Sequence, residues 1–257
     1  MEQICADLAA EHAALDELVA SLTEPGWSTP TPADDWAIRD QVSHVWFFDQ
    51  RAHLALTDPA GFQTDMEWLL ANGGTDASIA PGRAMTGDAL LAAWRADRRK
   101  LLDVAGGVDP SSRVPWYGPA MAARSFITAR LMETWAHGQD VADALGVRRV
   151  PTARLRHVAH IGVRARPFSY MIRSMPLPAE PVYVALEGPD GDRWEWGDPG
   201  ADRVTGPALD FCLVVTQRRH VGDTDLRVEG VAAREWIGIA QAFAGAPGNG
   251  RRPGQFR

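Results

Sequence analysis

Two side chains that can bind a metal ion stand one helical turn apart near the middle of the chain. Glu133 and His137 lie in an Ala/Leu-rich run, about residues 120–145, with no proline and no glycine before Gly138. The run therefore predicts one long helix, and at 3.6 residues per turn both side chains project from the same face. A carboxylate on a largely apolar helix needs a partner, and a bound cation is one way to provide it.

The same helix allows a second interpretation that involves no metal. Arg130 and Asp140 fall on the same stripe as Glu133 and His137, so Glu–Arg and His–Asp pairs could form a purely structural network. A third ligand from another helix would favour the metal. In that case Asp140 could orient His137 or a bound water from outside the ligand set.

Composition limits the kinds of protein this can be. The chain has 257 residues, 46% of them hydrophobic, and a net charge of −7, which suits a globular protein without a nucleic-acid partner. Two cysteines, Cys5 and Cys212, do not make a disulfide framework and favour a reducing compartment. No signal-peptide pattern or membrane-length apolar run is present. We expect a soluble cytoplasmic protein, either a monomer or a homodimer.

Hydrophobic periodicity predicts two domains and an α+β class overall. In residues 1–147, the pattern predicts four long helices that form an up-and-down bundle. The first ends near residue 22, and the other three span about 36–57, 87–105 and 120–145. Residues 148–246 predict a smaller α+β domain, with helices at about 152–170, 207–217 and 233–244, a hairpin from 181–187 and 193–196, and a strand at 226–229. The Gly- and Pro-rich tail, 247–257, predicts disorder.

For several other polar residues, the sequence predicts only an approximate position or role. His12, next to Glu11, is expected at the surface or its boundary. Asp49 falls within the apolar stripe of the second predicted helix, so it is a candidate to support a site from outside the ligand set. A basic cluster in the third helix is expected to form a solvated face; it comprises Arg95, Arg98, Arg99 and Lys100.

A third metal ligand comes from a family resemblance. The segment from Trp36 to His44, WAIRDQVSH, resembles the W-[ST]-x-x-[DE]-x-x-x-H signature of the DinB-like, mycothiol-dependent maleylpyruvate isomerase N-terminal domain. The resemblance implies that His44, Glu133 and His137 are metal ligands on a helical bundle. Ala37 stands where the family has a Ser/Thr helix cap, so we expect Asp35 to cap the helix instead.

The resemblance extends into the second domain. Residues 215–218, VTQR, followed by L-x-V-x-G at 226–230, are similar to the family's LTGR…L-x-V-x-G segment. This implies that Arg218 is catalytic and holds a substrate carboxylate in a fork geometry. Gln217 replaces the usual glycine. The string ETWAHGQD at 133–140 resembles a subgroup known only as metal-binding, so the substrate stays open.

Two imidazoles and a carboxylate make the open ligand set of catalytic zinc, although iron, nickel or manganese would accept the same donors. Such a cation can hold a thiol as its thiolate, and the resemblance implies that the thiol is mycothiol. The predicted function is that of a mycothiol S-transferase or mycothiol-dependent isomerase acting on a small electrophile. Two alternatives stay open: a hydrolase that uses metal-bound hydroxide, and a non-catalytic protein that binds a metal or small molecule.

Overall fold

The computed structural model describes residues 1–200 and 202–256. The chain divides into two compact units, with the boundary between Arg149 and Val150. The first unit is almost entirely helical, and the second combines helices with a four-stranded sheet. The predicted α+β class is therefore confirmed. Among the described residues, no helix is both long and apolar enough to cross a membrane.

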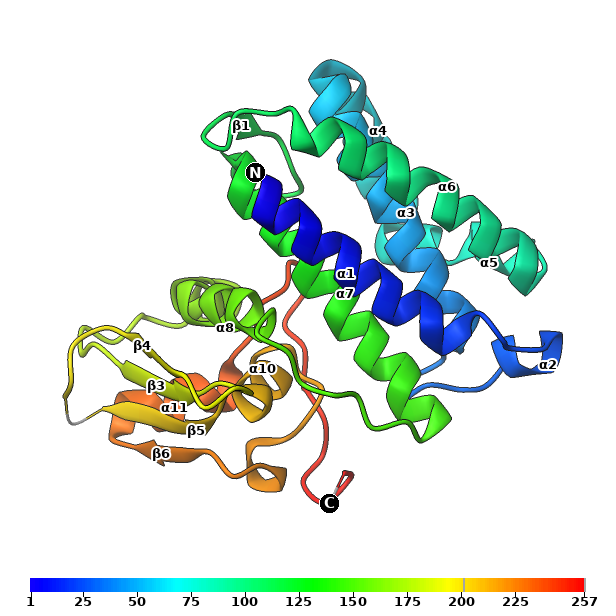
Figure 1. Cartoon of the computed structure of the whole chain (residues 1–257). Coiled ribbons are helices and arrows are strands. Elements are labelled where there is room, and N and C mark those ends of the chain that lie inside the picture. Colours follow the sequence, from blue (N-terminus) through cyan, green and yellow to red (C-terminus); the bar gives the residue numbers. More distant parts are fainter. Residues whose placement is uncertain (201, 257) are drawn as a thin grey trace. The chain divides into compact units, whose positions relative to one another are not determined.

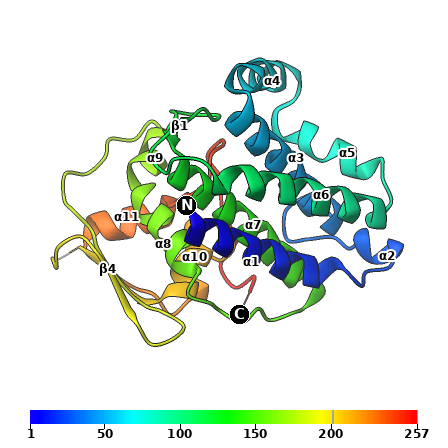
Figure 2. The ribbon, with the colours of Figure 1, turned by 45° about the horizontal axis from the view of Figure 1, so that its top comes forward.

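Four long helices form the core of the first unit. They are α1 (Glu2–Val19), α3 (Ile38–Thr57), α6 (Gly87–Gly106) and α7 (Ala123–Leu145). Both α1 and α3 pack against α6 and α7, and α1 runs alongside α7 in both ribbon views (Figures 1 and 2). Each helix turns an apolar face inward, and the shared core includes Leu15, Val42, Leu90, Trp94 and Val141.

Short elements connect these helices: α2 (Glu24–Trp27), α4 (Pro59–Asn72), η1 (Gly74–Ser78), α5 (Ala80–Arg83), and the antiparallel strands β1 (Arg113–Val114) and β2 (Met121–Ala122). Of these, α4 begins at Pro59. The Asp58 carboxylate accepts a 2.9 Å hydrogen bond from the Gly61 amide. Asp58 and Pro59 therefore end α3 and start α4.

The start of α3 differs from the expectation that Asp35 caps it. The backbone N–H of Ala37 donates to the Asp40 carboxylate at 2.9 Å, so Asp40 stabilises the helix end from its first turn. Arg83 of α5 forms an ion pair with Asp40 at 2.7 Å. Asp35 lies outside the helix with φ of 61°. The first turn of α3 therefore also binds α5, through the ion pair between Asp40 and Arg83.

One buried carboxylate connects all four long helices. Asp49 of α3 accepts hydrogen bonds from Trp94 of α6 at 3.0 Å and from Arg130 of α7 at 2.9 Å, and His12 of α1 lies 3.3 Å away. Burial raises the pKa of Asp49, but the Arg130 charge, His12 and the hydrogen bonds outweigh it and bring that pKa to about 2. We call Asp49, Arg130, His12 and Trp94 the Asp49 network. His12 is 1% exposed, so its predicted surface position was wrong.

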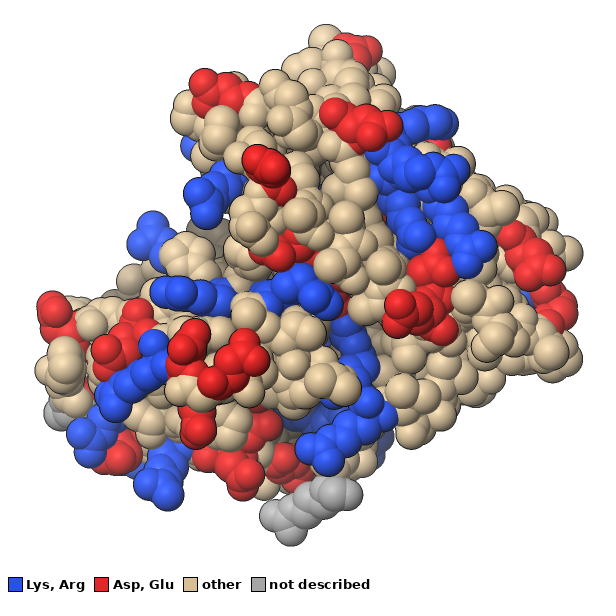
Figure 3. Space-filling model, viewed as in Figure 1, with Lys and Arg blue, Asp and Glu red and all other residues tan. Residues whose placement is uncertain are grey.

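The basic cluster of α6 is only in part a solvated face. Figure 3 shows basic residues gathered over α6 next to acidic ones. Arg95 and Arg98 both form ion pairs with Asp16 of α1, at 2.5 and 2.6 Å. Arg99 and Lys100 are exposed as expected. The two inner arginines thus connect α6 to α1, because Asp16 lies on the side of α1 that faces them.

The sheet of the second unit contains a parallel pair that the sequence pattern did not indicate. The strands are β3 (Tyr183–Glu187), β4 (Arg193–Trp196), β5 (Arg203–Pro207) and β6 (Arg227–Glu229), in the order β4-β3-β5-β6 (Figure 1). The predicted hairpin is confirmed as the antiparallel pair β3–β4. β5 is parallel to β3, with Val184 of β3 opposite Val204 of β5. It is antiparallel to β6.

The helices of the second unit are α8 (Leu155–Arg164), α9 (Arg166–Met171), α10 (Ala208–Val215) and α11 (Val231–Ile239), with a short turn η2 (Val221–Asp223). The single helix predicted at 152–170 is two helices, since Pro167 occupies the first turn of α9 and cannot continue α8. α10 packs against α8 and against β3 and β5.

The tail from residue 247 to residue 256 has no helix or strand but makes defined hydrogen bonds. The Gly248 carbonyl accepts from Arg173 at 2.8 Å, and the Gly254 amide donates to Asp223 at 2.8 Å. These bonds attach the tail to the second unit, although its composition predicts disorder.

Candidate metal centre

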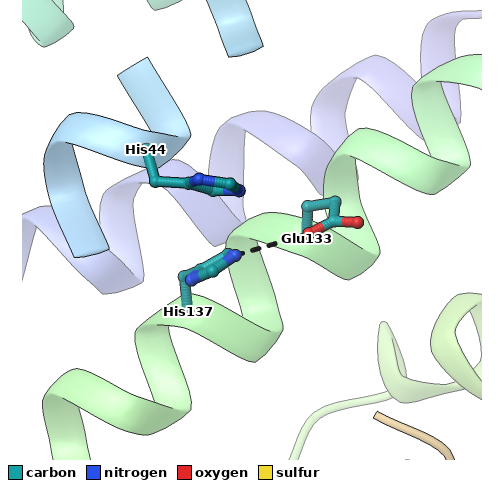
Figure 4. Close-up of side chains that lie close together, drawn as sticks. All are labelled: His44, Glu133 and His137. Carbon is teal, nitrogen blue, oxygen red and sulfur yellow. Dashed lines mark ion pairs between the residues drawn. The ribbon is translucent and has the colours of Figure 1, made fainter. Parts of the chain in front are cut away.

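The structure brings together the three residues predicted to bind a metal. His44 of α3 faces Glu133 and His137 of α7 (Figure 4), and one ligand atom from each residue lies within 4.8 Å of the others. His137 Nε2 and a Glu133 carboxylate oxygen are 3.4 Å apart. Two ligands of a tetrahedral zinc ion, each at about 2.0–2.1 Å from it, would be roughly 3.3 Å apart. The pair on α7 therefore already has the separation that an ion requires.

Two different helices position these ligands. Glu133 and His137 are one turn apart on α7, so the helix alone fixes their relation. His44 depends on the packing of α3 against α7. Both histidines are buried, and the His137 side chain is 10% exposed against 23% for the Glu133 side chain. The ligand set is thus inside the first unit but accessible on the Glu133 side.

Gln41 of α3 determines which nitrogen of His137 can bind an ion. His137 Nδ1 lies 2.6 Å from Gln41 Oε1. The Gln41 amide nitrogen donates to the Thr31 hydroxyl at 2.9 Å, and that hydroxyl donates to the Trp36 carbonyl at 2.9 Å. This chain directs the amide oxygen of Gln41 to His137, so Nδ1 carries the proton and Nε2 presents its lone pair beside Glu133.

His44 has an equivalent partner in Ser78, at the end of η1. Ser78 Oγ lies 2.8 Å from His44 Nδ1, which leaves Nε2 of His44 for the ion. Ser43 attaches this segment to α3, because its hydroxyl donates to the Ser78 carbonyl at 2.7 Å and accepts from the Gly82 amide at 3.1 Å. A Cβ on Gly82 would be 2.4 Å from Ser43 Cβ. Only glycine allows this close approach.

Sequence reasoning missed both of these partners. Gln41 precedes His44 by three residues and therefore shares its helix face, which is a pattern that could have identified it. Ser78 is 34 residues from His44 in sequence, in a segment without hydrophobic periodicity. Nothing in the local sequence connects the two. Hydrogen bonds of this kind to metal-binding histidines fix ring orientation and tautomer.

The other residues predicted to act at the site have different surroundings. Asp140 is buried in α7 at 1% exposure, and the residue that orients His137 Nδ1 is Gln41 rather than Asp140. Arg130, predicted as a possible partner of Glu133, pairs with Asp49. Arg218 belongs to the second unit. Its guanidinium donates to the Thr216 carbonyl at 2.7 Å.

Near Arg218, the second unit has a small open cavity of about 60 Å³. Its lining includes Arg219 and His220, and the residues that line it do not include Arg218. The Arg218 guanidinium lies 6.0 Å from the ring centroid of Phe243. Its role toward a substrate carboxylate remains a prediction.

We predict that Gln41→Leu weakens metal binding by about 10–100-fold, the usual effect of losing a partner of a metal-binding histidine. Leucine has a similar side-chain volume but cannot accept a hydrogen bond from His137 Nδ1. The dissociation constant is measured by competition with a chromogenic chelator. Gln50→Leu is the control, because Gln50 lies on the same helix and binds Asp97. Equal metal affinity in both variants would contradict the role of Gln41.

Comparison with known proteins gives the family and similar structures. The sequence model of the family described as the mycothiol maleylpyruvate isomerase N-terminal domain matches residues 8–142 of this chain. Two uncharacterized proteins of Mycobacterium tuberculosis are 48% identical over 249 residues, covering 96% of this chain and 97% of theirs. A crystal structure of mycothiol-dependent maleylpyruvate isomerase is similar with a TM-score of 0.58 and 17% identity, covering 85% of this chain and 89% of that one. A mutant of that enzyme gives the same TM-score, 0.58, at 16% identity.

Proposed function

The chain belongs to the family of the mycothiol maleylpyruvate isomerase N-terminal domain, and from this premise we propose that it is a metal-dependent enzyme that uses mycothiol as a cosubstrate. The proposed reaction is S-transfer or isomerisation of a small electrophile. The observation that carries the proposal is the convergence of His44, Glu133 and His137 within 4.8 Å, from two helices. Two further residues are proposed to take part: Arg218, and Asp140 as a group that orients a bound water rather than His137.

The residues present fit a divalent ion, and zinc is the first choice for two imidazoles and a carboxylate. Such an ion would hold a coordinated thiol as thiolate at neutral pH. Gln41 and Ser78 keep both Nδ1 atoms engaged, so the two Nε2 atoms are directed to one point. Glu133 supplies the negative charge that partly offsets the ion.

A thiolate can then react in either of two ways. Addition to a conjugated alkene forms a C–S bond and moves the π electrons toward the carbonyl, giving a single bond that can rotate. Elimination of the thiolate from the rotated adduct gives the isomer, whereas protonation of the adduct gives a stable thioether. Arg218 is proposed to bind a carboxylate of the substrate through charge-assisted hydrogen bonds. The protein would act in the cytoplasm, as a monomer or homodimer, without a nucleic-acid or membrane partner.

The proposal is tested by metal analysis of the purified protein and calorimetric titration with mycothiol. We expect about one ion per chain and mycothiol binding that is lost after chelation and restored by zinc. Metal without thiol binding, together with ester or amide hydrolysis, would overturn the thiol reaction in favour of a hydrolase. Thiol binding without turnover of any electrophile would leave a binding protein.

We predict that Arg218→Ala raises KM for a carboxylate-bearing electrophile by about 10–100-fold, the value of a hydrogen bond to a charged group. Metal content should not change, because Arg218 is not among the ligands. Steady-state kinetics with mycothiol and an electrophile that carries both a carboxylate and an aromatic ring provide the measurement. Arg227→Ala, an exposed arginine of β6, is the matched control. An unchanged KM would show that Arg218 has only a structural role.

A further inference from the structure

Aromatic rings continue from the ligand histidines across the first unit. The Phe48 ring of α3 lies 4.7 Å from that of His44, measured between centroids. Phe48 in turn contacts Tyr117 at 5.5 Å and Trp116 at 6.2 Å, in edge-to-face geometry. Trp116 and Tyr117 belong to the segment that joins β1 and β2. We call Phe48, Trp116 and Tyr117 the aromatic wall.

Two fully buried rings, Phe62 and Phe126, pack against Trp116 of the aromatic wall. Trp116 stacks on Phe62 of α4 with centroids 5.4 Å apart and planes 7° from parallel, and it meets Phe126 of α7 at 5.0 Å. Phe62 and Phe126 are 0% exposed. The three rings of the wall are only half-buried. Rigid rings with an open side are therefore held next to a metal-ligand histidine.

The open side of the wall is apolar. The Tyr117 hydroxyl is itself buried and lies near Arg51, so the accessible part of this side chain is ring carbon. Burial raises the pKa of Tyr117 to about 12, although the nearby Arg51 charge acts in the opposite direction. Tyr117 therefore stays neutral. Arg51 forms an ion pair with Asp65 at 3.0 Å, so the arginine beside Tyr117 already has a carboxylate partner.

We propose that the aromatic wall is the subsite for the electrophile, and that it selects substrates with a flat aromatic group on the carbonyl that activates the alkene. Offset and edge-to-face contacts stabilise such a group on the rings, whereas a small dianion would lose hydration there without a partner. This inference rests on the proposed function and narrows its substrate class. It favours an aryl-conjugated enone over a small dicarboxylate.

The corresponding reaction is a balanced addition. The thiolate sulfur forms a bond to the β-carbon of the enone, and the π electrons move to the carbonyl oxygen as an enolate. The α-carbon then takes a proton from solvent. The product is a thioether that contains all the atoms of the thiol and the enone, and no oxidant or reductant takes part.

A matched pair of substrates tests the subsite. Phenyl vinyl ketone and methyl vinyl ketone carry the same reactive group, with and without an aromatic ring. With mycothiol and the metal-loaded enzyme, we expect kcat/KM for the phenyl compound to exceed that for the methyl compound by about tenfold or more, after subtraction of the uncatalysed rates. A ratio near one would overturn the subsite, while turnover itself would still support the thiol reaction.

Variants identify the wall as the source of this preference. Phe48→Leu and Trp116→Leu remove a ring but keep an apolar side chain, and each is expected to bring the ratio close to one. Trp68→Leu is the control, because Trp68 lies on α4 and is 55% exposed. A preference that persists in both wall variants would overturn the proposal.

If neither ketone is turned over, a binding measurement tests the aromatic subsite separately from the proposed thiol reaction. Ethyl phenyl ketone is an unreactive analogue of the aryl substrate, and its binding is measured by calorimetry. Binding that Phe48→Leu weakens about tenfold would support the subsite even though the thiol reaction had failed. No detectable binding to the wild-type protein would overturn the subsite as well.

Discussion

In the His137→Ala protein, we expect metal affinity to fall by more than about 100-fold, beyond the loss caused by removing an outer partner of a ligand. The substitution removes one of three donors and leaves Glu133 without the nitrogen 3.4 Å away. Catalytic zinc has three protein ligands and a water molecule, whereas this variant would keep only two protein ligands, on different helices. Metal content by mass spectrometry should therefore fall from about one ion per chain to less than about one-tenth.

Matched variants make this result specific. His44→Ala and Glu133→Ala should reduce metal content in the same way, because each removes a donor of the same set. His53→Ala is the control, since His53 lies on α3 with His44 but outside the group of ligand atoms. Turnover with mycothiol should follow metal content in all four proteins. Full occupancy in His137→Ala would rule out this metal centre.

The second large effect is expected from Asp49→Ala, which should lower the free energy of unfolding by about 3–5 kcal/mol, the usual cost of breaking a buried ion pair. Arg130 is 3% exposed, so its charge would be left buried without a carboxylate. Trp94 and His12 would lose the same partner. The contacts of α3 with α1, α6 and α7 would all be weakened by this single change.

Urea unfolding monitored by circular dichroism measures the loss. Asp97→Ala is the matched control, because Asp97 also accepts a hydrogen bond from a tryptophan, Trp46, but its side chain is 19% exposed. That variant should lose about 1 kcal/mol or less. A similar small loss in Asp49→Ala would show that the Asp49 network contributes little.

Acid unfolding gives an independent measure of the same residue. The pKa of Asp49 in the folded protein is about 2, below the ordinary value of 3.8. Its contribution to stability is therefore fully present above about pH 4 and is lost as the pH falls towards about 2. The Asp49→Ala protein should lack this part of the acid dependence. Identical pH profiles for the two proteins would contradict a depressed pKa.

Much of the fold followed from the sequence because helices are encoded locally. The apolar spacing that predicts α1, α3, α6 and α7 lies within each segment, and a proline or glycine near most ends limits its length. The hairpin β3–β4 was predictable for the same reason, since its two strands are joined by a short turn. β5 was missed because its pairing with β3 depends on residues outside its own short segment.

For the site, the sequence by itself determined the pair Glu133 and His137, because a spacing of four residues on a helix fixes their geometry. A family signature, rather than periodicity, indicated His44. Only the tertiary structure decided that Gln41 and Ser78 hold the two imidazoles, and that Asp49 connects four helices. These contacts join residues 34 to 96 positions apart. Side-chain partners so distant in the chain depend on which helix faces pack together, and the periodicity within one helix does not specify its neighbour.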